Sequence, residues 1–163
     1  MQQAHGAQGN ALTLNAELVG RTYPPTTAYV VGREKVREFA AAIGDANPAY
    51  TDVAAAQALG YTDVIAPPTF AFVVSYAGSA LAAADPELGL DYSRVVHGEQ
   101  RFAYTRPIVA GDALVATATI EAIRAVAGND ILTTRVDLET EAGEPVVSTT
   151  TVIVARGTAE ERA

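Results

Sequence analysis

The stretch GDANPAYTDVAAAQ, residues 44–57, decides how this chain is interpreted. Apolar residues ahead of it recur at helical spacing, which predicts a helix that ends at Gly44. An aspartate, an Asn-Pro pair and an aromatic residue follow in that order, with the carboxylate at Asp45 and the phenol at Tyr50. Thr51 is expected to cap a second, alanine-rich helix. The sequence thus predicts two helices joined by a loop that carries a carboxylate and a phenol.

A second apolar segment follows, and it is predicted to form the longest helix. Pro67-Pro68-Thr69 opens it, because proline suits the first helical position, and Asp85-Pro86 ends it. Apolar residues cover nearly all sides of this helix, so it should be buried on most of them. The predicted elements are a strand at 29–31, helices over 36–43, 52–59 and 67–84, and strands at 95–104, 112–126, 132–138 and 146–154, with turns at 128–130 and 141–144.

One apolar helix followed by an antiparallel meander predicts an α+β fold, in which a long antiparallel sheet wraps around one buried helix. The chain has 163 residues, which is enough for one domain with a core. We expect that domain at residues 18–157, after a flexible N-terminal tail over 1–17 and before a C-terminal tail over 158–163.

Composition excludes several kinds of site. The net charge of −8 at pH 7 argues against nucleic acid or an anionic membrane as the main partner. The absence of cysteine excludes disulfides and thiolate nucleophiles, and the two histidines, His5 and His97, lie too far apart in sequence to favour a zinc site. With no long apolar span and no visible signal peptide, we expect a soluble cytoplasmic protein.

Two groups of basic residues leave two interpretations open. Either group is suited to meet phosphates or the acidic surface of a carrier protein, or it forms a solvated face of a helix or a strand. The groups are Arg33, Lys35 and Arg37, and Arg94, Arg101 and Arg106.

Beyond the loop, three further stretches carry a family resemblance: VGREKVREFA at 31–40, APPTF at 66–70, and RF at 101–102 running on to RPIVAGD at 106–112. Together with residues 44–57, they resemble the MaoC-like (R)-specific hydratase/dehydratase family over roughly residues 18–157. The chain is most similar to the actinobacterial FAS1-like dehydratase branch, which contains the small subunits of mycobacterial-type (3R)-hydroxyacyl-ACP dehydratases. The resemblance implies a hot dog fold, no cofactor, and reversible addition of water to a trans-2-enoyl thioester.

That chemistry needs a carboxylate and an imidazole around one water, and a backbone N–H at a helix N-terminus that holds the thioester oxygen. Asp45 stands at the position of the family's aspartate. Tyr50 takes the position of the family's histidine, and a phenol with an ordinary pKa of about 10 is a poor base near neutrality. The family's oxyanion glycine aligns with Pro68, which has no N–H; loss of one such donor typically costs about a hundred- to a thousandfold in rate. Thr69 is the candidate substitute.

Each of the candidate catalytic residues also has a structural interpretation. Asp45 either serves the site or caps the Asn-Pro turn after it. Tyr50 either hydrogen-bonds a ligand or fills the space of the imidazole. His97 is either a relocated base, oriented by Glu99, or a histidine at a subunit interface. The residues that the resemblance assigns to acyl-thioester binding are Asn47, Pro68, Thr69, Phe70 and Val73.

The leading hypothesis is a non-catalytic, acyl-binding subunit of a (3R)-hydroxyacyl-thioester dehydratase of fatty-acid metabolism. It would pair with a second hydratase chain that has the intact aspartate and histidine, and its ligand would be an acyl-CoA or acyl-ACP thioester. The alternative is an active homodimeric hydratase that uses Asp45 with His97 or Tyr50. A thioesterase on the same fold is a weaker third hypothesis, because the sequence offers no additional acidic residue on the central helix.

Overall fold

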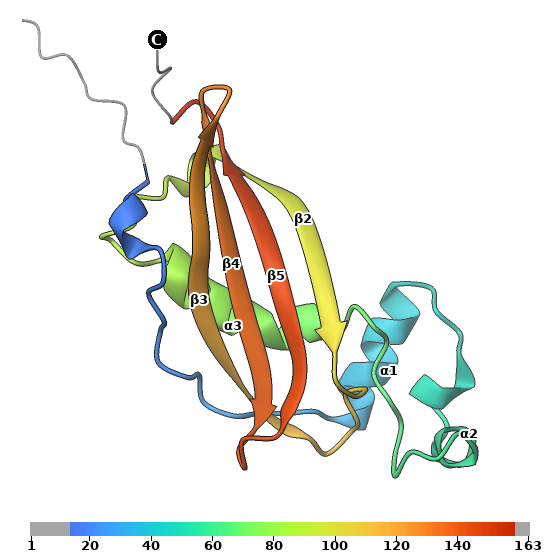
Figure 1. Cartoon of the computed structure of the whole chain (residues 1–163). Helices are drawn as coiled ribbons and strands as arrows, with labels where there is room; N and C mark the ends of the chain where they lie inside the picture. Colours follow the sequence, from blue (N-terminus) through green and yellow to red (C-terminus); the bar gives the residue numbers. More distant parts are fainter. Residues whose placement is uncertain (1–13, 159–163) are drawn as a thin grey trace, which may run out of the picture.

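An antiparallel sheet of five strands curls around one helix, α3 (Figure 1). The computed structural model describes residues 14–158, so most of both predicted tails, with His5, lies outside the described residues. The strand order is β1-β3-β4-β5-β2, which confirms the predicted α+β architecture. The elements are η1 (Ala16–Leu18), β1 (Tyr29–Val30), α1 (Arg33–Ala42), η2 (Pro48–Tyr50), α2 (Val53–Ala58), α3 (Ala71–Ala83), η3 (Tyr92–Arg94), β2 (Val95–Tyr104), β3 (Ala113–Val126), β4 (Asn129–Thr140) and β5 (Pro145–Ala155).

The core lies between α3 and the inner face of the sheet. Alternate residues of β3 and β4 face inward, as the period of two in the sequence predicts. Small residues at the helix–sheet contact let α3 approach closely: a Cβ built on Gly78 would lie 3.1 Å from Val136 Cγ1 and 3.3 Å from Ala116 Cβ. The fully buried inner residues of these strands include Leu114, Ala116, Ala118, Ile120 and Val136.

The prediction that α3 is buried on most sides is wrong for the single chain. The sheet covers one side of the helix, whereas Phe72, Tyr76 and Leu81 on the other side are 36%, 55% and 45% exposed. The helix also starts later than predicted, at Ala71, after a turn over residues 68–70. No helix in the described part of the chain has both the length and the apolarity needed to cross a membrane.

Two local details differ from the sequence prediction. Asp52, not Thr51, caps α2, because its carboxylate accepts the Ala54 amide at 2.8 Å. The β3–β4 turn lies at Ala127 and Gly128, whose φ angles of 49° and 74° fit a tight hairpin.

The first described residues belong to the core, although the sequence places them in a tail. Leu14 is 5% exposed, and its amide donates to the buried Asp130 carboxylate at 3.0 Å. Leu18, in η1, is also buried against the core cluster. The folded unit therefore includes residues 14–17.

Candidate functional site

The end of α1 delivers Asp45 to the site. Gly44 adopts a φ of +72°, a left-handed conformation that glycine takes at low cost. The Asp45 amide donates to Ala40 O at 3.0 Å and the Gly44 amide donates to Ala41 O at 3.2 Å. This pair of bonds is the Schellman motif, and it reverses the chain directly after the helix.

The Asp45 side chain supports the turn that follows. Its Oδ1 accepts the Asn47 amide at 3.2 Å, and Asn47 Oδ1 in turn accepts the Ala49 amide at 3.0 Å to cap η2. Asp45 is half-buried, and it lines a shallow cavity of about 350 Å³ together with residues from the end of α1. The turn-stabilising role expected of this carboxylate is thus present, and one face of it still meets the cavity.

Tyr50 lies next to this carboxylate and is nearly closed off from solvent. Its residue is 6% exposed. Burial raises the pKa of Tyr50 above its ordinary value, and the negative charge of Asp45 raises it further, whereas a hydrogen bond with Asn47 acts in the opposite direction. A raised pKa means that the phenol holds its proton at neutral pH. The phenol at the histidine position is therefore protonated at neutral pH.

Backbone hydrogen bonds tie this loop to the start of α3. The Ile65 amide donates to Ala49 O at 3.1 Å, and the Ala66 amide donates to Ile108 O at 2.8 Å. Arg33 of α1 holds the same segment from the other side, through a bidentate pair with the Asp63 carboxylate. Hydrogen bonds and one ion pair thus join the signature loop (residues 44–57), the segment before Pro67 and the loop after β2.

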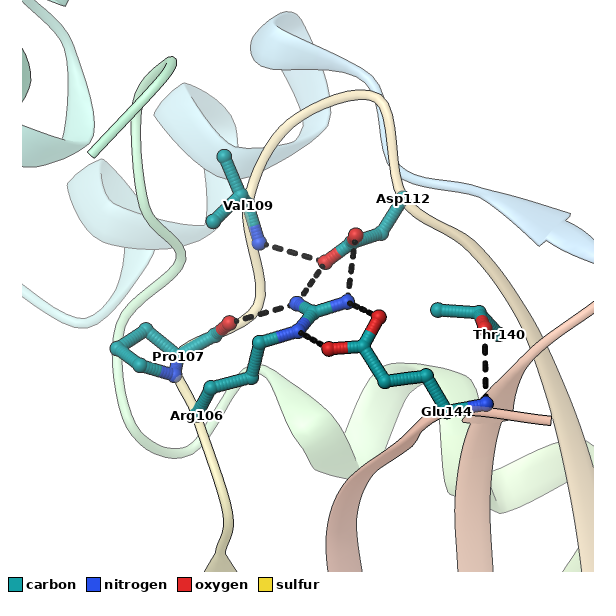
Figure 2. Close-up of polar contacts among 6 residues, drawn as sticks. All are labelled: Arg106, Pro107, Val109, Asp112, Thr140 and Glu144. Carbon is teal, nitrogen blue, oxygen red and sulfur yellow. Dashed lines mark hydrogen bonds and ion pairs between the residues drawn. The ribbon is translucent and has the colours of Figure 1, made fainter. Parts of the chain in front are cut away.

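Arg106 fixes the loop after β2, as Figure 2 shows. Its guanidinium donates to both oxygens of Asp112 at 2.8 and 3.0 Å, to Glu144 Oε1 at 2.9 Å and to Pro107 O at 3.0 Å. The Val109 amide also donates to Asp112 at 2.8 Å. Asp112 and Glu144 raise the pKa of Arg106 above its ordinary value. The RPIVAGD motif is therefore closed by its own first and last residues.

This pairing answers part of the open question on the basic groups. Arg33 and Arg106 are bound to carboxylates of the chain, Arg101 pairs with Glu99, and Arg37 pairs with Glu34. Their charges are largely neutralised within the described residues. The side chains of Arg33, Arg37 and Arg101 are 61%, 53% and 68% exposed, as the solvated-face interpretation predicts, and binding of phosphates or of a carrier protein stays a prediction.

The N-terminus of α3 faces a residue that the sequence does not single out, Tyr104. Its hydroxyl donates to Pro68 O at 2.7 Å. Burial raises the pKa of Tyr104 to about 12, a hydrogen bond from the Ala71 amide acts in the opposite direction, and Tyr50 raises the pKa slightly further. An inward-facing aromatic residue at a strand end is the only sequence signal for this contact.

The other predicted ligand-binding residues have varied surroundings. Phe70 is fully buried, with its ring edge-on to Phe39 at 5.4 Å between centroids, and Val73 packs against the core. Asn47, Pro68 and Thr69 are exposed near the start of α3 and the signature loop. Phe70 is thus a core residue, and its contribution to ligand binding stays a prediction.

His97 lies at the other end of β2. Its Cα partner is Ile153 of β5, its ring meets Phe72 edge-on at 5.9 Å, and it lines a small cavity beside α3. Tyr104 lies seven positions further along the strand, which corresponds to roughly 20 Å. In Figure 1, β2 runs from that end toward α1. Glu99, the predicted orienting group, pairs with Arg101. Within one chain, the structure brings Asp45 together with Tyr50 and not with His97.

Comparison with known proteins shows the family to which the chain is related. A family model for the FAS1-like dehydratase domain region matches residues 17–149. A UPF0336 protein of Streptomyces coelicolor is 60% identical over 149 residues, which is 91% of this chain and 99% of that protein. A UPF0336 protein of Saccharopolyspora erythraea is 55% identical over 150 residues, which is 92% of this chain and 96% of that protein.

Solved structures show the same fold. A MaoC-like dehydratase is 38% identical with a TM-score of 0.79, over 85% of this chain and 42% of that chain. The truncated HadBC (3R-hydroxyacyl-ACP dehydratase) complex of Mycobacterium tuberculosis is 32% identical with a TM-score of 0.72, over 84% of this chain and 96% of that chain. The chain therefore belongs to the FAS1-like dehydratase family and has the hot dog fold of the MaoC-like dehydratases.

Proposed function

We propose that this chain is a non-catalytic, acyl-binding subunit of a (3R)-hydroxyacyl-thioester dehydratase. The observation that carries the proposal is the buried phenol of Tyr50 beside Asp45. Hydration needs a group that accepts a proton from water, and a phenol with a raised pKa keeps its own proton at neutral pH. Asp45 alone has no imidazole with which to share the water.

The start of α3 supports the same proposal. Pro68 has no N–H at the position that aligns with the family's oxyanion glycine, and its carbonyl already accepts a hydrogen bond from Tyr104. A carbonyl oxygen repels the negative charge that develops on a thioester oxygen, whereas an amide N–H stabilises it. Asn47 and Thr69, both exposed beside this helix start, are proposed to contact the thioester without taking part in proton transfer.

The partner is proposed to bind along β2 and the exposed side of α3. β2 is an edge strand of ten residues, and such a long unpaired edge favours pairing with another chain. Phe72 and Tyr76 continue this edge as an exposed apolar face, with a cavity of about 140 Å³ between α3, β2 and β5. The similar HadBC structure is itself a complex. We therefore infer a second hot dog chain, one that carries Asp-x-Asn-Pro-x-His.

Turnover by the assembled complex tests this proposal. The chain is mixed with a catalytic hydratase chain from the same genome, and hydration of crotonyl-CoA is followed by loss of the enoyl absorbance. Asp45→Asn in this chain should leave the rate of the complex within about twofold, because proton transfer occurs in the partner. Loss of turnover by that variant in a complex of normal size would contradict the non-catalytic role.

A matched pair of surface variants tests the interface. Phe72→Glu places a charge on the exposed face of α3 and should abolish co-elution with the catalytic chain. Val30→Glu makes the same kind of change on β1, the opposite edge strand, where Val30 is 68% exposed, and should leave co-elution unchanged. The reverse pattern would place the partner on the other edge of the sheet.

The second candidate function is an active homodimeric hydratase, favoured by the retained Asp45 and its contact with the shallow cavity. In that case, the isolated chain hydrates crotonyl-CoA, and Asp45→Asn abolishes this turnover. Loss of turnover in His97→Gln or in Tyr50→Phe would then identify the group that serves as the base.

A further inference from the structure

The inner face of the sheet is apolar on one side and polar on the other. On β3, the inward residues from Leu114 to Ile120 are apolar and fully buried. On β5, the inward residues include Thr149 and Thr151, which are 0% and 5% exposed. Thr134 of β4 lies directly opposite Thr151 and is 4% exposed. Burial of a hydroxyl costs free energy that valine, with the same shape, avoids, so these hydroxyls indicate a role other than packing.

A β-bulge at Gly98 adds an amide to the polar side. The register of β2 on β5 shifts by one residue between His97 and Glu99. Unbroken alternation from His97 would place Glu99 on the inner face. The bulge places Gln100 there instead, opposite Thr151, whose hydroxyl donates to Gln100 Oε1 at 2.9 Å. The inner face thus holds a neutral amide, oriented by a threonine, in place of a carboxylate.

Two polar atoms of this inner face have no hydrogen-bond partner among residues 14–158. They are Gln100 Nε2 and the Thr149 hydroxyl oxygen, and both are buried. Gln100 pairs with Thr151, two positions from Thr149 on the same face of β5. A buried polar group without a partner lowers stability, and each one in a native protein calls for an explanation. The unpaired N–H donor is suited to an oxygen atom that a ligand supplies.

A cavity of about 140 Å³ lies beside these residues, between α3, β2, β4 and β5. Thr134 and Thr151 line it, and His97 lies in the same wall. Its volume is several times the roughly 30 Å³ that one water molecule occupies in the liquid, so it has room for a segment of a hydrocarbon chain. The rest of the lining is mostly apolar and includes Phe72, Tyr76, Leu132 and Ile153.

We propose that this cavity binds an acyl chain that carries a hydroxyl group far from its thioester. The inference rests on the proposed function, because it takes the start of α3 as the thioester side of the site. The Thr151 proton is used on Gln100, so the Thr151 oxygen accepts the O–H of the ligand. The oxygen of the ligand accepts in turn from Thr134 or from Gln100 Nε2.

The position of these groups along β2 sets the position of the hydroxyl on the chain. Gln100 lies four positions before Tyr104, whose hydroxyl donates to Pro68 O at the start of α3. Four positions of strand correspond to about 13 Å. An extended chain of about eleven bonds covers that distance, so a dodecanoyl chain with a terminal hydroxyl has the matching length.

Isothermal titration calorimetry on the full chain tests the proposal with two probes, ω-hydroxydodecanoyl-CoA and dodecanoyl-CoA. We expect the hydroxylated probe to bind about threefold to tenfold more tightly, which is the value of one net hydrogen bond. Non-specific apolar binding favours the opposite order, because the hydroxyl makes the probe less apolar. Equal affinities, or tighter binding of dodecanoyl-CoA, would overturn the inference and leave the acyl-binding role intact. Binding of neither probe would contradict the acyl-binding role itself and the inference with it.

Valine variants assign the preference to the inner face. Thr151→Val removes the hydroxyl, keeps the shape of the side chain and should abolish the preference for the hydroxylated probe. Thr134→Val should reduce it. Thr150→Val is the matched control, because Thr150 is the next residue on β5 but faces the outer side of the sheet, and it should leave the preference unchanged. A preference that survives in both Thr151→Val and Thr134→Val would refute the site. Neither probe is hydrated, so these outcomes do not depend on turnover.

Discussion

Asp112→Asn should destabilise the loop after β2, which supports the signature loop. The carboxylate accepts two bonds from Arg106 and one from the Val109 amide, and its side chain is only 14% exposed, against 27% for Arg106. Removal of a hydrogen bond to a charged group costs about 1.5–3 kcal/mol. Asparagine keeps one acceptor oxygen, and Glu144 still neutralises Arg106. We therefore expect a loss of about 2 kcal/mol in the free energy of unfolding.

Urea denaturation, followed by far-ultraviolet circular dichroism, measures this loss. With a slope of about 2 kcal/mol/M for a chain of this size, the midpoint should fall by about 1 M. Glu144→Gln is the matched control, because Glu144 binds the same guanidinium but is 57% exposed, and its loss should cost less than about 1 kcal/mol. If Glu144→Gln costs as much as Asp112→Asn, then burial does not set the strength of this cluster and the reasoning fails.

Three further predictions concern the core, a helix cap and acid stability. Gly78→Ala should lower the free energy of unfolding by about 1–2 kcal/mol despite the better helix propensity of alanine, because the added Cβ would lie 3.1 Å from Val136 Cγ1. A higher urea midpoint for this variant would contradict the prediction and show that the sheet moves aside without cost. Asp52→Ala should cost about 1 kcal/mol through loss of the α2 cap, whereas Thr51→Ala should cost less, as the same urea titration will reveal. The Tyr23 hydroxyl, followed by the Glu87 amide, lowers the pKa of Asp85 in the folded chain. A carboxyl whose pKa is lower in the folded chain than in the unfolded chain stabilises the fold at pH values above its unfolded pKa of about 4, and this stabilisation is lost as pH falls through the folded pKa. Asp85→Asn lacks this carboxyl, so its urea midpoint should fall less than that of the wild type between pH 7 and pH 3. Equal decreases would contradict this linkage.

The sheet was predictable because its signals are local. In β3, apolar residues alternate with a period of two, and all the inward residues from Leu114 to Ile120 are fully buried. The helix before Gly44 was predictable for the same reason, since a glycine in left-handed conformation ends it. The exposed side of α3 was not predictable from periodicity. Apolar side chains at a subunit interface and in a core have the same pattern, and a single sequence does not separate the two.

Turn and cap positions were harder to predict from the sequence, because adjacent residues are equally suited to the same role. Thr51 and Asp52 are both good helix caps, and only the backbone geometry selects Asp52. Gly128, Asn129 and Asp130 all favour turns, but positive φ angles at Ala127 and Gly128 place the hairpin one residue earlier. Such choices depend on strand register, which is set by the whole sheet.

The candidate site was predictable where its residues are neighbours in sequence and not where the fold joins distant segments. Asp45 and Tyr50 lie on one loop, five positions apart, and the charge of Asp45 contributes to the raised pKa of Tyr50. The contact between Tyr104 and Pro68 depends on how far the sheet curls around α3, which no local pattern reports. The same holds for His97, whose position along β2 separates it from the signature loop.

The rate at which the isolated chain hydrates crotonyl-CoA tests the central claim most directly. The purified chain, without any partner, is assayed at neutral pH beside its Asp45→Asn variant. We expect both proteins to give the same rate as buffer, because the buried Tyr50 phenol does not accept a proton. Turnover by the wild-type chain that disappears in Asp45→Asn would contradict the claim and show that Asp45 works with another base.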